Sequence, residues 1–130
     1  ATVTYEGLTY RNNEAAFQAQ KTFSDDFRTT FTTLAPSEAK RKGRRVRLRQ
    51  DWEQVKDGIM EEIVRAKFTQ NPELRKQLLA TGNADLIEGN HWNDRYWGVD
   101  ARTGAGENHL GKILMKIREE LLKTQASPES

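Results

Sequence analysis

The sequence predicts an α+β fold, a mainly helical single domain with a small antiparallel β-sheet. Two observations predict it: apolar residues recur at helical spacing after about residue 13, and the first ten residues form two short runs around a glycine turn. A chain of 130 residues is long enough for one domain with its own core. We assign that domain to residues 1–124 and expect residues 125–130 to form a disordered tail.

The sheet is predicted at the start of the chain, over "TVTYEGLTY", residues 2–10. Short apolar runs flank Glu6-Gly7, and a glycine tolerates the positive φ that a tight hairpin turn needs. These residues should therefore form a β-hairpin.

Two helices should follow the hairpin. Asn12 or Asn13 can cap the first, "EAAFQAQK", because a short side-chain oxygen accepts hydrogen bonds from N–H groups that the first turn leaves unpaired. Ser24 can cap the second, which would place three apolar residues on one face: Phe27, Phe31 and Leu34.

The clearest helix is "DWEQVKDGIMEEIVRAKFTQ", residues 51–70. Its apolar side chains recur at i, i+3 and i+4 and form one stripe: Trp52, Val55, Ile59, Met60, Ile63, Val64 and Phe68. Such a stripe is typical of a core helix. A shorter helix ahead of it should begin at Ser37-Glu38 and break at Gly43.

Two more helices complete the scaffold. Asn71-Pro72-Glu73 combines a cap, a proline at the first helical position and an acid in the first turn, and Gly82 marks the end of that helix. The final helix, "NHLGKILMKIREELLK", carries an apolar stripe of its own: Leu110, Ile113, Leu114, Ile117 and Leu121. Residues 81–107 are left as a long loop, where binding groups are commonly found.

The composition excludes several classes of protein. The chain has no cysteine, and its two histidines, His91 and His109, are isolated, so we expect neither a zinc-thiolate site nor any other metal or cofactor. No run approaches the roughly 20 apolar residues that span a bilayer, and no signal-peptide pattern is present. The expectation is a cytoplasmic protein that does not act at a membrane.

The charge distribution is uneven. The net charge is +2, but "KRKGRRVRLR", residues 40–49, holds seven basic residues and no acid, and the rest of the chain nets −5. A basic segment of this kind attracts phosphates. It is equally typical of a solvated helix end or an edge strand.

One phosphate-binding motif can be dismissed. "GENHLGKI", residues 106–113, matches the spacing of a P-loop, but Ile113 occupies the position where a Ser or Thr would reach Mg²⁺. A weaker hypothesis remains: a glycine-rich turn that opens a helix presents N–H groups to an anion, and Gly111 lets a ligand come close.

Two groups of polar and aromatic residues are candidates for chemistry. Asp94, Tyr96, Trp97 and Asp100, with Trp92, offer ring faces for stacking and carboxylates, which suits cleavage of a glycosidic bond. The alternative is a small satellite core with exposed acids. The second group is Glu14 beside Asn12-Asn13; it could serve as a base, or simply be a first-turn acid favoured by the helix dipole.

These segments occur in the order of a known family. "YEGLTYRNNEAAFQAQK", "AKRKGRRV", "WEQVKDGIMEEIVRAKFTQNPELRKQLLATGNADLIE", "DRYWG" and "GENHLGKILMKIREEL" resemble successive blocks of the NADAR superfamily, over residues 3–122. The resemblance implies a mainly helical α+β fold and N-glycosidase chemistry that needs no metal. Similar members hydrolyse phosphorylated riboflavin-pathway intermediates, and others remove ADP-ribose from guanine in nucleic acid. The substrate would thus be a ribosylated nucleotide or ADP-ribosylated nucleic acid.

Carried over residue by residue, the resemblance implies catalytic roles for Glu14, Lys21 and Asp94. It implies substrate-binding roles for a larger set: Asn12, Gly43, Arg44, Trp97, Gly98, Asn108 and Gly111. Trp97 would be a stacking face in a nucleoside pocket.

Glu14 and Lys21 are seven positions apart, about two helical turns, so both can face one pocket. Either a carboxylate orients water, or a lysine of lowered pKa forms a Schiff base with the opened sugar. We expect the first, with Glu14 as the principal group and Asp94 assisting, because a surface lysine near an acid stays protonated.

One feature departs from the family pattern. Members usually carry a segment with a Ser-Asn-Phe-like motif ahead of the hairpin, lining the same pocket, whereas this chain begins with the hairpin. Together with the basic segment, this keeps a second hypothesis open, a non-catalytic module that binds ADP-ribose or nucleic acid.

Overall fold

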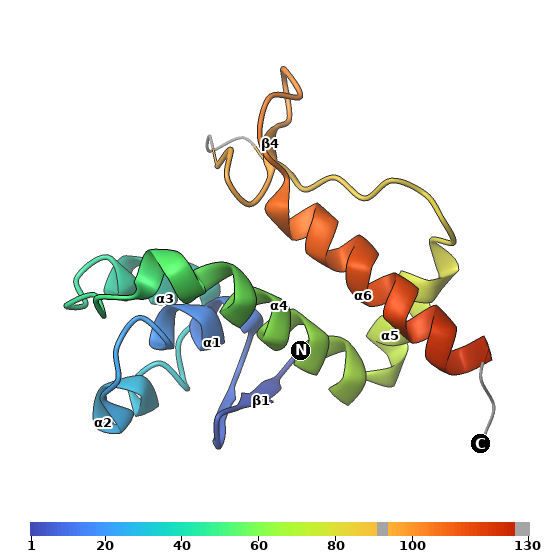
Figure 1. Cartoon of the computed structure of the whole chain (residues 1–130). Helices are drawn as coiled ribbons and strands as arrows, with labels where there is room; N and C mark the ends of the chain where they lie inside the picture. Colours follow the sequence, from blue (N-terminus) through green and yellow to red (C-terminus); the bar gives the residue numbers. More distant parts are fainter. Residues whose placement is uncertain (91–93, 127–130) are drawn as a thin grey trace. The chain divides into compact units, whose positions relative to one another are not determined.

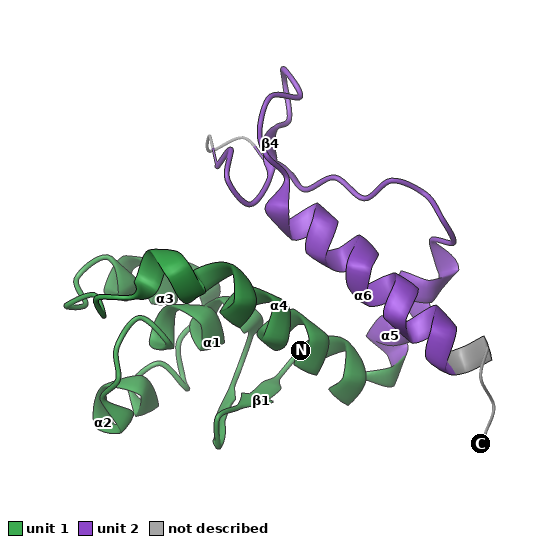
Figure 2. Ribbon diagram, in the orientation of Figure 1, with its two compact units in different colours: residues 1–72 green, residues 73–130 purple. Residues whose placement is uncertain are grey.

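The computed structural model of the protein describes residues 1–90 and 94–126 (Figure 1). His91, Trp92 and the end of the predicted tail, residues 127–130, lie outside the described residues. Most of the described chain is helical, and two small two-stranded sheets accompany the helices, so the predicted mainly helical α+β class is confirmed. Figure 2 shows two compact units, residues 1–72 and residues 73–130.

The hairpin of the first unit forms as predicted. β1 (Val3–Tyr5) pairs antiparallel with β2 (Leu8–Tyr10), and Val3 lies opposite Tyr10. Glu6 and Gly7 both have positive φ, 51° and 81°, as a two-residue hairpin turn that matches the strand twist requires.

The helix that follows the hairpin, α1 (Asn13–Ala19), is capped by Asn12, whose side-chain oxygen accepts a hydrogen bond from the Ala15 N–H at 2.8 Å. Residues 15–20 are all buried, so α1 runs through the interior of the unit. A helix of 7 residues is too short to be stable alone in water, and packing must hold it in place.

The second helix is shorter than predicted. Ser24 caps α2 (Asp25–Thr29) as predicted. The helix ends before Phe31 and Leu34, so the prediction that both lie on its apolar face is wrong. Hydroxyl groups of the threonine-rich stretch after residue 28 donate to backbone carbonyls, and β-branched residues also lower helix propensity. Phe31 is nevertheless completely buried, in the turn that follows.

Two further helices complete the first unit. α3 (Pro36–Gly43) begins with a proline, and the Ala35 N–H donates to the Glu38 carboxylate at 2.8 Å. α4 (Trp52–Gln70) packs against α1 and β1 and buries four side chains of the predicted stripe: Trp52, Met60, Ile63 and Val64. At its far end the Gln70 amide exchanges two hydrogen bonds with the backbone of Thr4.

The helices of the second unit also form as the sequence predicts, but the last one continues to Ala126, two residues into the segment predicted as a disordered tail, residues 125–130. α5 (Pro72–Ala80) ends before Gly82, which adopts a φ of +62°. α6 (His109–Ala126) buries Ile113 and Ile117, and the guanidinium of buried Arg118 donates to the Thr81 hydroxyl at 2.9 Å.

The segment predicted as a long loop contains a second sheet. β3 (Gly89–Asn90) and β4 (Val99–Asp100) form a short parallel pair. The loop is tied to α6 by Asn108, whose side chain accepts from the Glu88 N–H and donates to the Leu86 carbonyl, both at 2.9 Å. A Cβ atom at Gly111 would lie 2.2 Å from the Leu86 carbonyl oxygen, so only glycine allows this contact.

We therefore expect Gly111→Ala to destabilise the protein, by about 1–3 kcal/mol in the free energy of unfolding, because the added methyl group overpacks the loop against α6. Denaturant titration followed by circular dichroism measures this. The matched control is Gly58→Ala in α4, where no atom lies within 4 Å of the added Cβ. That substitution should stabilise the protein by about 0.5–1 kcal/mol, the usual gain in a helix interior. Equal stability of Gly111→Ala and wild type would contradict the close contact.

Candidate functional site

Three of the residues expected in the site come together in the first unit. Glu14 lies in the first turn of α1, and Arg44 is the C-cap of α3. Lys21 lies beyond the C-cap of α1, so the expectation that it shares one helix with Glu14 is wrong. The charges of Glu14, Arg44 and Lys56 nevertheless shift the pKa of Lys21, so all three lie within electrostatic range of it.

Lys21 differs from the surface lysine that the sequence predicts. Its side chain is about half-buried, with Nζ 6.0 Å from the centroid of the Trp52 ring. Burial lowers its pKa below the ordinary 10.5, Glu14 opposes that shift, and Arg44 and Lys56 add to it. The prediction of an ordinary surface lysine is therefore wrong, and burial favours the neutral amine of Lys21 more than that of an exposed lysine.

The Glu14 carboxylate is held from its own helix. Its Oε2 accepts a hydrogen bond at 2.7 Å from the side-chain amide of Gln18, which is 8% exposed. The amide oxygen of Gln18 lies against Gly43, where a Cβ atom would be only 1.9 Å away. Gly43 is buried, and packing against Gln18 accounts for it without a ligand.

Asn12 supports the same helix. Its side-chain oxygen caps α1, and its side-chain nitrogen donates to the Leu34 carbonyl at 3.0 Å. Asn12 thus fixes the start of the helix that carries Glu14.

The second unit holds the other expected residues. Oδ1 of Asp94 accepts hydrogen bonds from the backbone N–H groups of Tyr96 and Trp97, at 3.2 and 3.0 Å. The side chain of Asn90 exchanges two further bonds with the Asp94 backbone, at 2.8 and 2.9 Å. Asp94 therefore organises the turn that presents Trp97.

An aromatic stack extends from that turn. The Tyr96 ring contacts the Trp97 ring edge-on, with centroids 4.9 Å apart. It also contacts the His109 ring, with centroids 4.2 Å apart. His109 belongs to the following helix, so its place in this group is not predicted from the spacing of the loop residues. Trp92, which the sequence predicts in this group, lies outside the described residues.

The prediction of an anion site at the start of α6 is wrong. The backbone N–H groups of residues 107–110 donate to the carbonyl oxygens of residues 95–98, at 2.7 to 3.1 Å. These bonds use the N–H groups that an anion would need. A Cβ atom at Gly98 would lie 2.2 Å from the Glu88 carbonyl, so Gly98 and Gly111 are both explained by the docking of this loop.

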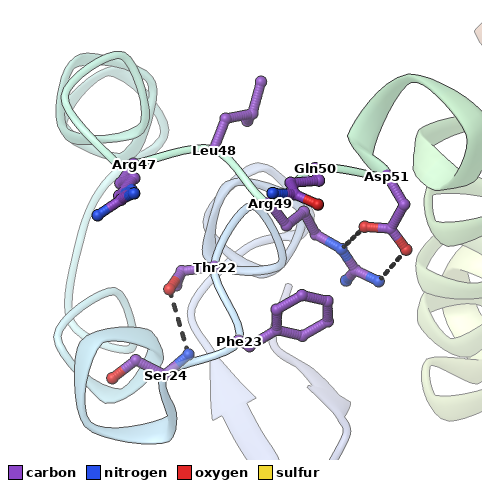
Figure 3. A pocket seen from close by; sticks show the side chains of 8 residues that line it. All are labelled: Thr22, Phe23, Ser24, Arg47, Leu48, Arg49, Gln50 and Asp51. Atoms are coloured by element: carbon purple, nitrogen blue, oxygen red, sulfur yellow. Dashed lines mark hydrogen bonds and ion pairs between the residues drawn. The ribbon is translucent and has the colours of Figure 1, made fainter.

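A groove that the sequence did not predict adjoins Lys21 along the chain (Figure 3). It has a volume of about 570 Å³ and is lined by residues 22–24 and 47–51. The Arg49 guanidinium lies 4.1 Å from the centroid of the Phe23 ring and forms two hydrogen bonds with Asp51. The backbone N–H of Arg49 donates to the Lys21 carbonyl at 2.9 Å. None of the expected site residues lines this groove.

The basic segment combines a helix end with an irregular stretch. Residues 40–43 close α3, and residues 44–51 form no strand, so the edge-strand alternative is excluded. The ammonium of Lys42 lies 5.0 and 5.5 Å from the Phe27 and Phe31 ring centroids. Arg44 is exposed and faces the neighbourhood of Lys21.

The described residues were also compared with the requirements of a metal site and of a membrane-spanning helix. Among residues 1–90 and 94–126, no three His, Asp or Glu side chains converge as metal ligands. Within that same part of the chain, no helix is long and apolar enough to cross a membrane.

Comparison with known proteins places this arrangement in a family. A model of the NADAR domain matches residues 1–122. N-glycosidase YbiA of Escherichia coli (strain K12) is 44% identical over 119 residues, which cover 89% of this chain and 73% of that protein. A riboflavin biosynthesis protein of Vibrio vulnificus is 41% identical over 124 residues, 92% of this chain and 33% of that protein.

The fold agrees with the sequence match. The NMR structure of the Escherichia coli protein YbiA aligns with a TM-score of 0.86 at 39% identity, over 100% of this chain and 78% of that one. The ordered blocks, the family model and the shared fold lead to one conclusion: this chain belongs to the NADAR family.

Proposed function

We propose that this protein is an N-glycosidase that hydrolyses the bond between ribose C1 and the nitrogen of a base or amine, in a phosphorylated ribosylamine or an ADP-ribosylated guanine. The observation that carries the proposal is the half-buried Lys21 beside Glu14 and two other cations. The name N-glycosidase borne by YbiA, at 44% identity, supports the reaction class. The riboflavin biosynthesis protein of Vibrio vulnificus supports a ribosylamine as the first substrate to test.

The environment of Lys21 favours the covalent route over direct hydrolysis. A lysine becomes nucleophilic when desolvation or a neighbouring cation raises the fraction of neutral amine. Lys21 has both influences, since burial lowers its pKa and Arg44 and Lys56 lower it further. We therefore assign Lys21 as the nucleophile and Glu14 as the group that moves the proton.

The reaction then has three balanced steps. The ribosylamine ring opens to an imine between C1 and the substrate nitrogen. The neutral Lys21 amine adds to C1, Glu14 transfers a proton from the lysine nitrogen to the substrate nitrogen, and the C1–N bond to the base or amine breaks, leaving a lysine Schiff base. Water adds to C1 and the C1–lysine bond breaks, which releases the sugar aldehyde and restores both side chains.

Arg44 in the first unit and Trp97 in the second each have the chemistry to bind part of such a substrate. The exposed Arg44 guanidinium can hold a phosphate oxygen, because charge-assisted contacts of this kind are short and often bidentate. Within the second unit, the Trp97 ring is of the kind that stacks on a base. Asp94 acts as a positioning residue, since its carboxylate already accepts the N–H groups of the turn that carries Trp97.

A product screen tests the function. Purified protein should release a free base or amine from a phosphorylated riboflavin-pathway ribosylamine, from ADP-ribosylated guanine in nucleic acid, or from NAD, detected by mass spectrometry. Glu14→Gln should lower kcat on that substrate by roughly 10²-fold with little change in KM, the scale of a positioned proton-transfer group.

The screen also distinguishes the second hypothesis. If all three substrate classes stay intact while ADP-ribose binds tightly, the protein is a binding module. Full activity of Glu14→Gln would remove Glu14 from the reaction.

Lys21 can be tested by trapping. Borohydride added during turnover should reduce the Schiff base to a stable adduct that maps to Lys21 by peptide mass spectrometry, and Lys21→Arg should give no adduct and no turnover. Adduct formation should increase with pH, because only the neutral amine attacks. Its midpoint should lie below 10.5, the ordinary lysine pKa, since burial lowers the pKa of Lys21.

Two variants should shift the midpoint of this pH dependence in opposite directions. Arg44→Ala removes a charge that lowers the pKa of Lys21, so the midpoint should move up; Glu14→Gln removes a charge that raises it, so the midpoint should move down. Turnover without any trapped adduct would favour direct hydrolysis with Glu14 as the principal group.

Arg44 should recognise phosphate. We expect Arg44→Ala to raise KM for a phosphorylated substrate by roughly tenfold or more, the range of a lost charge-assisted hydrogen bond, with a smaller effect on the dephosphorylated analogue. The comparison of KM between the two substrates measures this. Arg41→Ala is the control, an exposed cation of the same segment. Equal losses on both substrates would show that Arg44 does not contact the phosphate.

A further inference from the structure

The side chain of Gln18 combines two features that general packing does not explain. It lies one helical turn after Glu14 on α1 and donates to the Glu14 carboxylate at 2.7 Å. Its own oxygen, Oε1, is buried and has no hydrogen-bond partner among the described residues. A buried acceptor without a partner destabilises a protein, so its presence needs a reason.

The orientation of the amide follows from the carboxylate. An ionised carboxylate only accepts hydrogen bonds, so the nitrogen of the Gln18 amide must face Glu14 and the oxygen must point the other way. The oxygen then lies against Gly43, where a Cβ atom would be 1.9 Å from Oε1 and 2.8 Å from Cδ. Only glycine at position 43 leaves space for this orientation.

We propose that Gln18 and Gly43 form a positioning pair that holds the Glu14 carboxylate in one orientation for proton transfer. The amide of Gln18 fixes Oε2 of Glu14, and Gly43 gives Gln18 the room to do so. The bond to Gln18 uses Oε2 of Glu14, so Oε1 is the oxygen that would face the substrate and Lys21. This role rests on the proposed function of Glu14, and it replaces the substrate contact that the family resemblance implies for Gly43.

The geometry explains why the arrangement is confined to this position. α1 packs against α3, and residues 15–20 are buried, so the Gln18 side chain has little access to water. The Gln18 side chain is only 8% exposed, and its amide nitrogen donates a hydrogen bond to Glu14. A displacement of about 1 Å in a reacting group can lower a rate roughly 10²-fold, so holding this carboxylate has a measurable effect.

Steady-state kinetics tests the pair. Gln18→Met keeps the length and volume of the side chain but removes its N–H donor, and should lower kcat by about tenfold to a hundredfold with KM within about twofold. Gly43→Ala should do the same, because its methyl group displaces the Gln18 amide. Gln20→Met is the matched control. Gln20 is a buried glutamine of the same segment, but it bonds to the Ala16 carbonyl and lies 3.5 Å from the Tyr10 hydroxyl, so its loss should lower Tm and leave kcat unchanged.

A double-mutant cycle separates positioning from substrate contact. In a Gln18→Ala background there is space beside position 43, so Gly43→Ala should lower kcat by less than about twofold further. If the losses from Gln18→Ala and Gly43→Ala instead multiply, or if Gly43→Ala acts mainly on KM, Gly43 contacts substrate and the proposal is overturned. Full kcat in Gln18→Met also overturns it.

An NMR measurement gives an answer that does not need turnover. The Gln18 side-chain amide, assigned by its loss in Gln18→Met, should have a proton signal shifted by the carboxylate. That signal should move in both Glu14→Gln and Gly43→Ala, but not in Gln20→Met. If wild type turns over no substrate and the signal still moves, the proposed function fails and the pair stands; a signal unchanged in Glu14→Gln or Gly43→Ala overturns the pair.

Discussion

The first unit depends on burying a seven-residue helix on nearly every side. α1 is too short to be stable alone, so its position is set by α3, α4 and the hairpin that pack around it. Three alanines, Ala15, Ala16 and Ala19, are completely buried, and their small side chains let these neighbours approach closely. The constraint also reaches the polar side chains of α1, because a buried polar group must find a partner inside the protein.

That requirement links packing to chemistry. Glu14 and Gln18 satisfy each other within α1, and Gln18 is accommodated only because Gly43 of α3 has no side chain. The chain then leaves the helix at Lys21, where surrounding side chains remove part of its hydration and lower its pKa. The lowered pKa of Lys21 and the hydrogen bond that Glu14 accepts from Gln18 thus both follow from how this part of the first unit is packed.

The second unit is held together by hydrogen bonds between its long loop and the start of α6. The first N–H groups of α6 bond to the carbonyl oxygens of residues 95–98, and Asn108 ties the loop at Leu86 and Glu88 to the same helix. Family motifs that suggest ligand contacts, the Asn-x-Leu-Gly block above all, here serve to hold a loop. The same loop carries Asp94, whose carboxylate accepts the N–H of Trp97.

The sequence by itself determined the features that depend on neighbours along the chain. The Glu6-Gly7 turn, the Asn12 cap, the start at Pro72 and the long periodic helices all formed as predicted, and the ordered blocks identified the family. Only the tertiary structure decided the early end of α2, the half-burial of Lys21, the contact between Gln18 and Gly43, and the loss of free N–H groups at α6. The reason is physical: a turn or cap is completed within a few residues, whereas burial, pKa and hydrogen-bond pairing depend on groups that meet only when distant segments pack together.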